Sequence, residues 1–381
     1  MPRRWIESTR ACGVLTASSA NPSDPRVSLE RVALCPARLE PTFSARPWGA
    51  RSLAPFFTAM TDLAEPLGEA WMSGSESRFS NGPFTGQTLA RAWPVMSPEW
   101  TGTAILREPT FPLLVKFIFT EEKLSVQVHP DDAYAAQHER AAGGCGKTEM
   151  WYTVRARPGA EVMVGLKAEV TRESFEREIA DGTVERSLEP IPMYDGDAIF
   201  VPAGTAHTIG PGLVLCEIQQ QSDLTYRVYD YNRRDAQGRT RPLHIEKALA
   251  VMRFGEQRGG KVEPVPIERG ALTKTFMAAC RYFVTEKWEF SESIKAESSL
   301  AHFDLLIVLD GSGEILYGSG SERFGSAQVW MVPAALGKFE IRPNSRTSLL
   351  RAYVPPNLDV VRCELSDSGL GEVEISRLVH A

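Results

Sequence analysis

The chain has 381 residues, of which 43% are hydrophobic and 24% charged, a composition typical of a globular protein with two domains or one large β architecture. Its formal net charge of −6 argues against a nucleic acid or an anionic membrane as the main partner, and it has no apolar run near the roughly 18 residues of a membrane span. Six cysteines without a CxxC pair favour reduced thiols in a cytoplasmic protein over a disulfide framework.

Residues 1–36 differ from the rest of the chain. They are rich in Arg, Ser, Ala and Pro, have no sustained periodicity and lack the long apolar core of a secretory signal. We predict a mostly disordered N-terminal extension. A start codon assigned too far upstream would explain it, and a transit peptide is the alternative.

The strongest strand signals begin after a loop-rich region. Residues 39–105 predict a short strand, long loops and one short helix over 87–93. Residues 112–119 are almost continuously apolar, which predicts a strand buried on both faces. Residues 124–130 predict the next strand, which ends at Pro130 because proline has no N–H to give to the ladder.

Helices and strands are mixed through the following residues. The pattern predicts helices over 130–137, 171–181 and 244–252, the second of them capped by Thr171 and stopped by Gly182. β-branched and aromatic residues with period-two alternation predict further strands. These strands lie within residues 148–154, 160–166, 191–201 and 213–220.

A polar segment with Gly and Pro, residues 255–268, is predicted to be a linker. Short strands separated by turn signals follow it, the pattern of a jelly roll or barrel. They are expected at 281–289, 303–309, 313–317, 328–332, 339–342 and 348–354. This part contains only His302 and His380 as histidines, without a His-x-His or Gln-x-His pair, so we assign the chemistry to the first part and packing or an interface to the second.

The stretch LSVQVHPDD, residues 124–132, is the centre of the predicted site. Gln127 and His129 are two residues apart, so on a strand they point to one face while Val126 and Val128 point to the other. An amide oxygen and an imidazole side by side on a rigid strand can form half of a metal site.

A second motif has the spacing Gly196-x5-Pro202-x-Gly204-x2-His207. Its first glycine suits a tight turn, and the proline and second glycine bend the chain after the strand, so that His207 projects into the mouth of a barrel. This spacing resembles the second sequence motif of cupin barrels.

With these motifs and the segment GKTEMWY, the chain closely resembles the type I mannose-6-phosphate isomerases (phosphomannose isomerases), in their shorter bacterial form. The resemblance covers residues 39–252 and rests on the segments PWGARSL, GEAW, LSVQVHPDD, GKTEMWY, GDAIFVPAGTAH, EIQQQSDLTYRVYDYNR and RPLHIEKAL. It implies a mainly β bicupin fold, two jelly-roll barrels with a few helices inserted in and after the first. The expected domains are a catalytic cupin at 37–254, the linker at 255–268 and a second cupin-like domain without a metal site at 269–381.

The resemblance also implies one Zn²⁺ per chain, held by Gln127, His129, Glu149 and His207. The implied reaction interconverts mannose 6-phosphate and fructose 6-phosphate through a cis-enediol. Two His, one Glu and a weak amide oxygen suit a catalytic zinc, which keeps a position for water or substrate and a net local charge of about +1. His138 and His244 lie outside these motifs and are expected to be structural or exposed.

Arg227 and Asp223 belong to the segment SDLTYR, which matches the family's SDxTxR stretch. A guanidinium at Arg227 suits both a dianionic phosphate and a developing oxyanion, and Asp223 is a candidate orienting or proton-handling partner. We place the two residues on a strand, four apart and on the same face. The alternative for the pair is a structural salt bridge.

Three further residues complete the candidate set. Lys147 resembles the family's active-site lysine and is assigned to phosphate binding or acid–base chemistry. Ser125 and Glu217 are candidate substrate-binding residues, with a structural role as the alternative for Glu217. Some longer members carry a histidine where this chain has Gly146, so the general base is left unassigned.

Two other functions remain open from the sequence alone. One is a non-catalytic, sugar-phosphate-binding or regulatory cupin protein; the other is an Fe(II) oxygenase on a cupin barrel, since residue types alone do not fix the metal. We expect a small-molecule sugar phosphate as the partner, neither nucleic acid nor membrane, and a cytoplasmic monomer or homodimer of carbohydrate metabolism.

Overall fold

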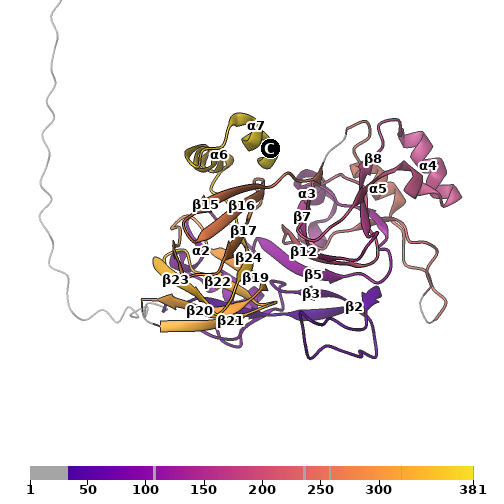
Figure 1. Ribbon diagram of the computed structural model, residues 1–381. Helices are drawn as coiled ribbons and strands as arrows, with labels where there is room; N and C mark the ends of the chain where they lie inside the picture. The colour runs from indigo at the N-terminus through magenta and orange to yellow at the C-terminus, as the bar shows by residue number, and fades with distance from the viewer. Residues whose placement is uncertain (1–32, 106–108, 235–236, 257–258, 319, 381) are drawn as a thin grey trace, which may run out of the picture. The chain divides into compact units, whose positions relative to one another are not determined.

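A computed structural model describes residues 33–105, 109–234, 237–256, 259–318 and 320–380 (Figure 1). Most of the predicted N-terminal extension therefore lies outside the described residues. Residues 33–381 form one compact unit. The predicted mainly β fold is confirmed, since the described residues form four antiparallel sheets.

The first half of the compact unit contains a 7-stranded and a 5-stranded sheet. In the large sheet the order is β14-β10-β7-β12-β5-β3-β2, and in the small sheet β13-β6-β11-β8-β9. The large-sheet strands are β2 (Thr42–Ala50), β3 (Leu67–Trp71), β5 (Leu113–Phe119), β7 (Glu149–Ala156), β10 (Ala198–Val201), β12 (Leu213–Gln220) and β14 (Gly260–Lys261). The small-sheet strands are β6 (Val126–Val128), β8 (Glu161–Leu166), β9 (Leu188–Pro192), β11 (His207–Ile209) and β13 (Tyr226–Tyr229).

The second half contains an 8-stranded sheet, β15-β16-β17-β24-β19-β22-β1-β4, and a 4-stranded sheet, β18-β23-β20-β21. The large-sheet strands are β1 (Ala37–Glu40), β4 (Arg78–Phe79), β15 (Val265–Arg269), β16 (Leu272–Ala279), β17 (Val284–Phe290), β19 (Asp304–Asp310), β22 (Val329–Val332) and β24 (Thr347–Tyr353). The small-sheet strands are β18 (Ile294–Glu297), β20 (Ser312–Tyr317), β21 (Gly320–Gly325) and β23 (Lys338–Pro343).

The strand order repeats between the halves. In the large sheets, β10-β7-β12-β5 corresponds to β22-β19-β24-β17, and in the small sheets β6-β11-β8-β9 corresponds to β18-β23-β20-β21. Corresponding strands follow one another in the same chain order. This is the order that two tandem jelly rolls require, so the repeat supports the bicupin expectation.

Alternation along the strands gives each large sheet two apolar faces. One face packs in the interior of its own half and the other in a core shared with the other half, so the halves form one unit. On β12, Cys216 and Ile218 join a core shared with Leu305 and Ile307 of β19, whereas Leu215 faces the interior of the first half. Figure 1 shows the two large sheets side by side.

Strand pairing also crosses the expected domain limits. The segment predicted as a linker contains β14, which pairs with β10, and most of β15, which pairs with β16. β1, near the start of the described chain, pairs with β22 of the second half. The limits themselves stay predictions.

The helices agree in part with expectation. They are α1 (Leu89–Ala92), α2 (Pro98–Thr101), α3 (Asp132–His138), α4 (Arg172–Asp181), α5 (Ile245–Val251), α6 (Leu358–Asp367) and α7 (Glu372–Leu378). In α4 the predicted cap and stop are confirmed: Thr171 accepts a hydrogen bond from Ser174 N–H, and Gly182 has a positive φ of 71°.

Two helices that the sequence reading did not predict follow the second half. α6 and α7 follow the last strand of the second half, drawn in yellow in Figure 1. Asn357 caps α6 by accepting from Val360 N–H, and Val361 and Leu365 are buried on one helix face. The Asn cap and this four-residue apolar spacing were the available signals.

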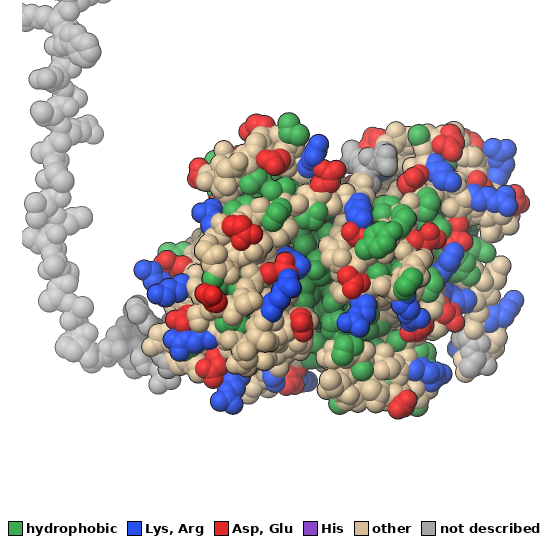
Figure 2. All heavy atoms as spheres, viewed as in Figure 1, with side chains coloured by type: hydrophobic (Ala, Val, Ile, Leu, Met, Phe, Trp, Pro, Cys, Tyr) green, Lys and Arg blue, Asp and Glu red, His purple; other side chains and the backbone are tan. Residues whose placement is uncertain are grey.

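Among the described residues, no helix is long and apolar enough to span a membrane. On the face drawn in Figure 2, basic and acidic side chains are interspersed. This mixture agrees with the modest net charge of −6.

Candidate metal centre and active site

The strand β6 orients its side chains as its alternation predicts. Val126 and Val128 are fully buried in an apolar cluster with residues of α5, and Gln127 lines a cavity on the opposite face. Gln127 pairs in register with His207 on one side and Arg227 on the other. Three neighbouring strands thus carry an imidazole, an amide and a guanidinium in one row.

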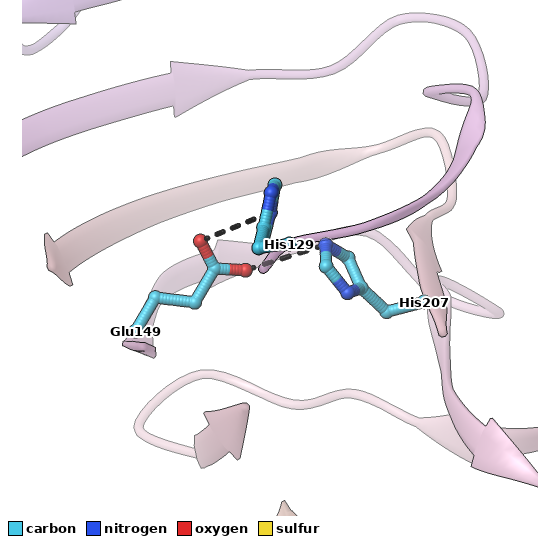
Figure 3. A group of neighbouring side chains, drawn as sticks. All are labelled: His129, Glu149 and His207. Atoms are coloured by element: carbon cyan, nitrogen blue, oxygen red, sulfur yellow. Dashed lines mark ion pairs between the residues drawn. The ribbon is translucent and has the colours of Figure 1, made fainter. Parts of the chain in front are cut away.

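His129, Glu149 and His207 converge into a cluster that could hold a metal ion (Figure 3). His129 follows β6, Glu149 begins β7 of the opposite sheet, and His207 begins β11. Their candidate ligand atoms all lie within 4.8 Å of one another. Nε2 of His129 is 3.6 Å from Glu149 Oε2, and Nε2 of His207 is 3.3 Å from Glu149 Oε1.

Backbone carbonyls orient both imidazoles toward this cluster. Nδ1 of His129 donates to Leu224 O at 2.8 Å, and Nδ1 of His207 donates to Thr205 O at 2.9 Å. Because carbonyl oxygens only accept, each Nε2 keeps its lone pair for a metal. Burial lowers the pKa of His207 to about 4 and is also the main cause that lowers the pKa of His129 well below its ordinary value. Both rings are therefore neutral, as metal ligands must be.

Glu149 provides a direct test of fit for a cation. Its side chain is fully buried, and Oε1 accepts no hydrogen bond from the described residues. Burial raises the pKa of this carboxyl well above its usual value, although Lys147 opposes that effect. A buried carboxylate with one oxygen that accepts no hydrogen bond from the described residues, beside two imidazoles whose unprotonated Nε2 atoms lie within 3.6 Å of it, fits a divalent cation such as zinc.

Gln127 adjoins the cluster but is a weaker member. Its amide nitrogen lies 3.3 Å from His207 Nε2. Amide N and O positions are assigned from the hydrogen-bond network, and the opposite orientation would bring the amide oxygen to the same place. The structure thus places Gln127 beside the cluster, and its role as a ligand stays a prediction.

Lys147 lies buried between the metal cluster and a second carboxylate. Its Nζ donates to Glu149, to Glu217 Oε1 at 3.1 Å, and contacts His129 Nε2 at 3.2 Å. Burial lowers the pKa of Lys147, but the two carboxylates outweigh this and raise it. Lys147 and Lys116 likewise keep the pKa of Glu217 below its ordinary value against the effect of burial. The site therefore holds a charged lysine and an ionised glutamate in contact.

Sequence reasoning missed Lys116. It lies in β5, within the run read as apolar and buried on both faces, and is only 2% exposed. Its Nζ is 3.8 Å from Glu217 Oε2 and 3.5 Å from Asp223 Oδ1, and it lies over the Trp71 ring at 4.6 Å. The available signal was the lysine itself, since a buried strand keeps a charge only with partners.

A cavity of about 480 Å³ opens beside the metal cluster. Every residue assigned from sequence to catalysis or substrate binding lines it, namely Ser125, Lys147, Glu217, Asp223 and Arg227. The metal candidates Gln127 and Glu149 also line it. Lining residues that sequence reasoning left without a role include Arg46, Glu69, Lys116, Thr225, Arg241 and His244.

Arg227 and Asp223 do not share a strand, contrary to expectation. β13 begins at Tyr226, so Asp223 lies in the preceding turn and contacts Lys116. Arg227 donates to Ser125 Oγ at 3.3 Å and to Pro242 O at 3.1 Å, and it has no carboxylate partner among the described residues. The salt bridge between the two, the structural alternative, is therefore absent from the described part of the chain.

Positive charge accumulates around Arg227. Burial and then the neighbouring Arg241 are the largest causes that lower the pKa of Arg227. His244, expected to be structural or exposed, is partly buried at the cavity wall, and its Nδ1 accepts from Arg227 N–H at 3.2 Å. The His138 ring lies tilted against the Tyr134 ring, with 4.3 Å between the centroids, and His138 is not in the metal cluster. This part of the cavity wall suits an anionic ligand.

Comparisons with known proteins agree with this geometry. The family model described as "Phosphomannose isomerase type I, catalytic domain" matches residues 37–151. Mannose-6-phosphate isomerase ManA of Bacillus subtilis is 34% identical over 311 residues, which cover 80% of this chain and 95% of that protein.

Solved structures show the same relation. The mannose 6-phosphate isomerase of Bacillus subtilis has a TM-score of 0.76 at 30% identity, covering 83% of this chain and 99% of that one. A mannose 6-phosphate isomerase bound with zinc and yttrium is 16% identical with a TM-score of 0.63, covering 84% and 99%, and shows a likeness of fold alone.

Fold and site together define a mainly β protein with a buried two-histidine, one-glutamate cluster beside a cavity of mixed charge. The chain belongs to the type I mannose-6-phosphate isomerase (phosphomannose isomerase) family.

Proposed function

We propose that this protein is a zinc-dependent aldose–ketose isomerase that interconverts mannose 6-phosphate and fructose 6-phosphate through a cis-enediol. The observation that carries the proposal is one cavity that combines three features. These are a buried cluster able to hold a cation, a charged Lys147–Glu217 pair, and a guanidinium, Arg227, that has no carboxylate partner in the described part of the chain. The donor set and the orphaned oxygen of Glu149 favour zinc.

The residues that would hold zinc are His129, His207 and Glu149, with the Gln127 amide as a fourth. One carboxylate leaves the bound ion with a net charge of about +1. When bound, zinc would supply a Lewis acid for the sugar's carbonyl and hydroxyl oxygens.

The other chemical roles in the isomerisation fall to side chains that line the cavity. Isomerisation moves a proton between two adjacent carbons, and oxyanion character develops on their oxygens. Lys147, held charged by two carboxylates, can donate to such an oxygen. Glu217 and Asp223 both line the cavity and both contact Lys116, so each is a candidate for the proton transfer at carbon.

The phosphate would lie on the basic wall of the cavity. Arg227 and Ser125 are already joined by a hydrogen bond of 3.3 Å, and their side chains offer donors of the kind that bind phosphate oxygens. Arg46 and Arg241 line the same wall. The substrate would then extend from Arg227 toward Lys147. We further propose a cytoplasmic enzyme that acts on this small molecule as a monomer or homodimer.

The decisive experiment measures turnover of mannose 6-phosphate by purified protein before chelation, after chelation, and after addition of Zn²⁺ or Fe²⁺. We expect activity to disappear on chelation and to return with zinc. Recovery with iron alone would replace zinc in the proposal. A folded, zinc-loaded protein that binds mannose 6-phosphate without turnover would favour the non-catalytic, sugar-phosphate-binding alternative.

A further inference from the structure

A turn of the second half contacts the loops that build the metal cluster. Arg281 and Tyr282 lie between β16 and β17. The Tyr282 hydroxyl donates to Asp132 Oδ2 at 2.5 Å, and the Arg281 guanidinium donates to the same oxygen. Arg281 also lies over the Tyr282 ring at 4.6 Å, so the two side chains support each other. Asp132 is three residues after His129 and begins α3.

The other oxygen of the same carboxylate holds two active-site segments. Asp132 Oδ1 accepts from Gly146 N–H and from the Gln220 side-chain amide, both at 2.9 Å. Gly146 directly precedes Lys147, and Gln220 is the last residue of β12, the strand that carries the cavity residue Glu217. One carboxylate thus joins three segments: the loop before Lys147 and the end of β12 from the first half, and the turn after β16 from the second.

These contacts fix the backbone on both sides of Lys147. Lys147 N–H donates to Pro130 O at 3.0 Å, and Thr148 N–H donates to Gln220 Oε1 at 2.9 Å. A Cβ at Gly146 would lie 2.6 Å from the carbonyl carbon of Asp131, so the loop packs directly against the start of α3. Thr148 is followed by the metal candidate Glu149.

We propose that Arg281 and Tyr282 are positioning residues of the active site, which act through Asp132 to fix the loop that carries Lys147 and Glu149. The second half would then contribute to catalysis without touching the substrate. Neither residue lines the cavity beside the cluster. This inference rests on the proposed isomerase activity, and zinc retention gives it a test that does not depend on turnover.

The experiment compares Tyr282→Phe, Arg281→Ala and the double variant with wild type. Supporting contacts behind metal ligands typically change metal affinity or activity about 10–100-fold when removed. We expect the double variant to lose kcat within that range, with KM changed less than threefold, and to release zinc faster to a chelator. Arg281→Lys, which keeps a donor, should recover most of the kcat lost in Arg281→Ala.

Two controls separate positioning from general destabilisation. Arg269→Ala removes an exposed arginine at the end of β15, which donates to Ser368 Oγ at 2.9 Å, and should leave kcat and zinc release unchanged. The melting temperature of each variant shows that it is folded. A folded double variant with wild-type kcat and zinc release overturns the proposal. If wild type itself has no turnover, the proposed function fails, and zinc release still tests Arg281 and Tyr282.

Discussion

The two halves of the compact unit share a strand order but fill their interiors differently. In the first half, Lys116 of β5 pairs in register with Glu217 of β12. In the second half the corresponding strands β17 and β24 pair Glu286 with Arg351, so the charges are exchanged. Glu149 begins β7, and its counterpart at the start of β19 is Asp304.

Because the charges are exchanged, the buried carboxylates of the second half pair with an arginine of the same half. Arg351 Nη2 lies 2.9 Å from Asp304 Oδ1, and Arg351 Nη1 lies 3.4 Å from Glu286 Oε2. Lys274 and Trp288 complete the environment of Glu286 at 3.2 Å and 2.8 Å. A guanidinium thus pairs with both carboxylates from within the chain, whereas Glu149 faces the two imidazoles of His129 and His207. The comparison teaches that the same strand order can form a cation site or a closed ion cluster. The outcome depends on whether the corresponding strand carries a carboxylate, as β12 does with Glu217, or a guanidinium, as β24 does with Arg351.

Replacing Glu149, the carboxylate of the metal cluster, should have the largest effect on zinc binding and turnover. Glu149→Gln keeps the side-chain shape but removes the negative charge of the metal cluster. We expect loss of bound zinc and a fall in turnover of roughly a thousandfold or more, since a metal-dependent step loses its cation. Zinc content and turnover measured on the same sample check this. Full zinc occupancy in Glu149→Gln would contradict the assigned ligand set.

A Glu-to-Gln substitution in the ion cluster of the second half should lower stability rather than activity. Glu286→Gln leaves Arg351 with one of its two carboxylates in a buried site, and breaking a buried pair typically costs about 3–5 kcal/mol. We expect a lower free energy of unfolding in urea, with zinc content and turnover kept by the folded protein. Loss of zinc from folded Glu286→Gln would mean that the two interiors are coupled.

Local periodicity explains what could be predicted of the site. Alternation along residues 124–130 placed Gln127 and His129 on one face, because side-chain direction depends only on adjacent residues. Contacts that join distant segments gave no such signal. Lys116 meets Asp223 at a separation of 107 residues, and Tyr282 meets Asp132 at a separation of 150. Only the folded sheets bring these pairs together, so Asp223 was wrongly placed on a strand beside Arg227.

Acid should weaken the metal-free first half through its buried imidazoles. His207 has a folded-state pKa of about 4 against an ordinary 6.5, so below pH 6.5 the unfolded chain binds a proton that the folded chain does not. The free energy of unfolding should therefore fall as pH drops from 6.5 to 4, by about 3 kcal/mol from this residue. Urea titrations of chelated protein at both pH values measure the loss. His207→Gln should reduce it, and an unchanged loss would contradict the assignment.

Substitution of Lys116 tests whether the active site of the first half depends on the positive charge of this buried lysine. It should have the smallest effect of the changes considered. Lys116→Met fills the same volume over Trp71 but removes the charge beside Glu217 and Asp223. Zinc should be retained, because Lys116 forms its ion pairs with Glu217 and Asp223 and is not a member of the metal cluster, while kcat should fall roughly tenfold as both carboxylates lose a positioning partner. Metal analysis and steady-state kinetics separate these outcomes. Lys116→Arg keeps the charge and should retain more activity than Lys116→Met. If the two variants are equally impaired, the shape of the side chain rather than its charge sets the cavity, and the contrast with Arg351 in the second half would not extend to function.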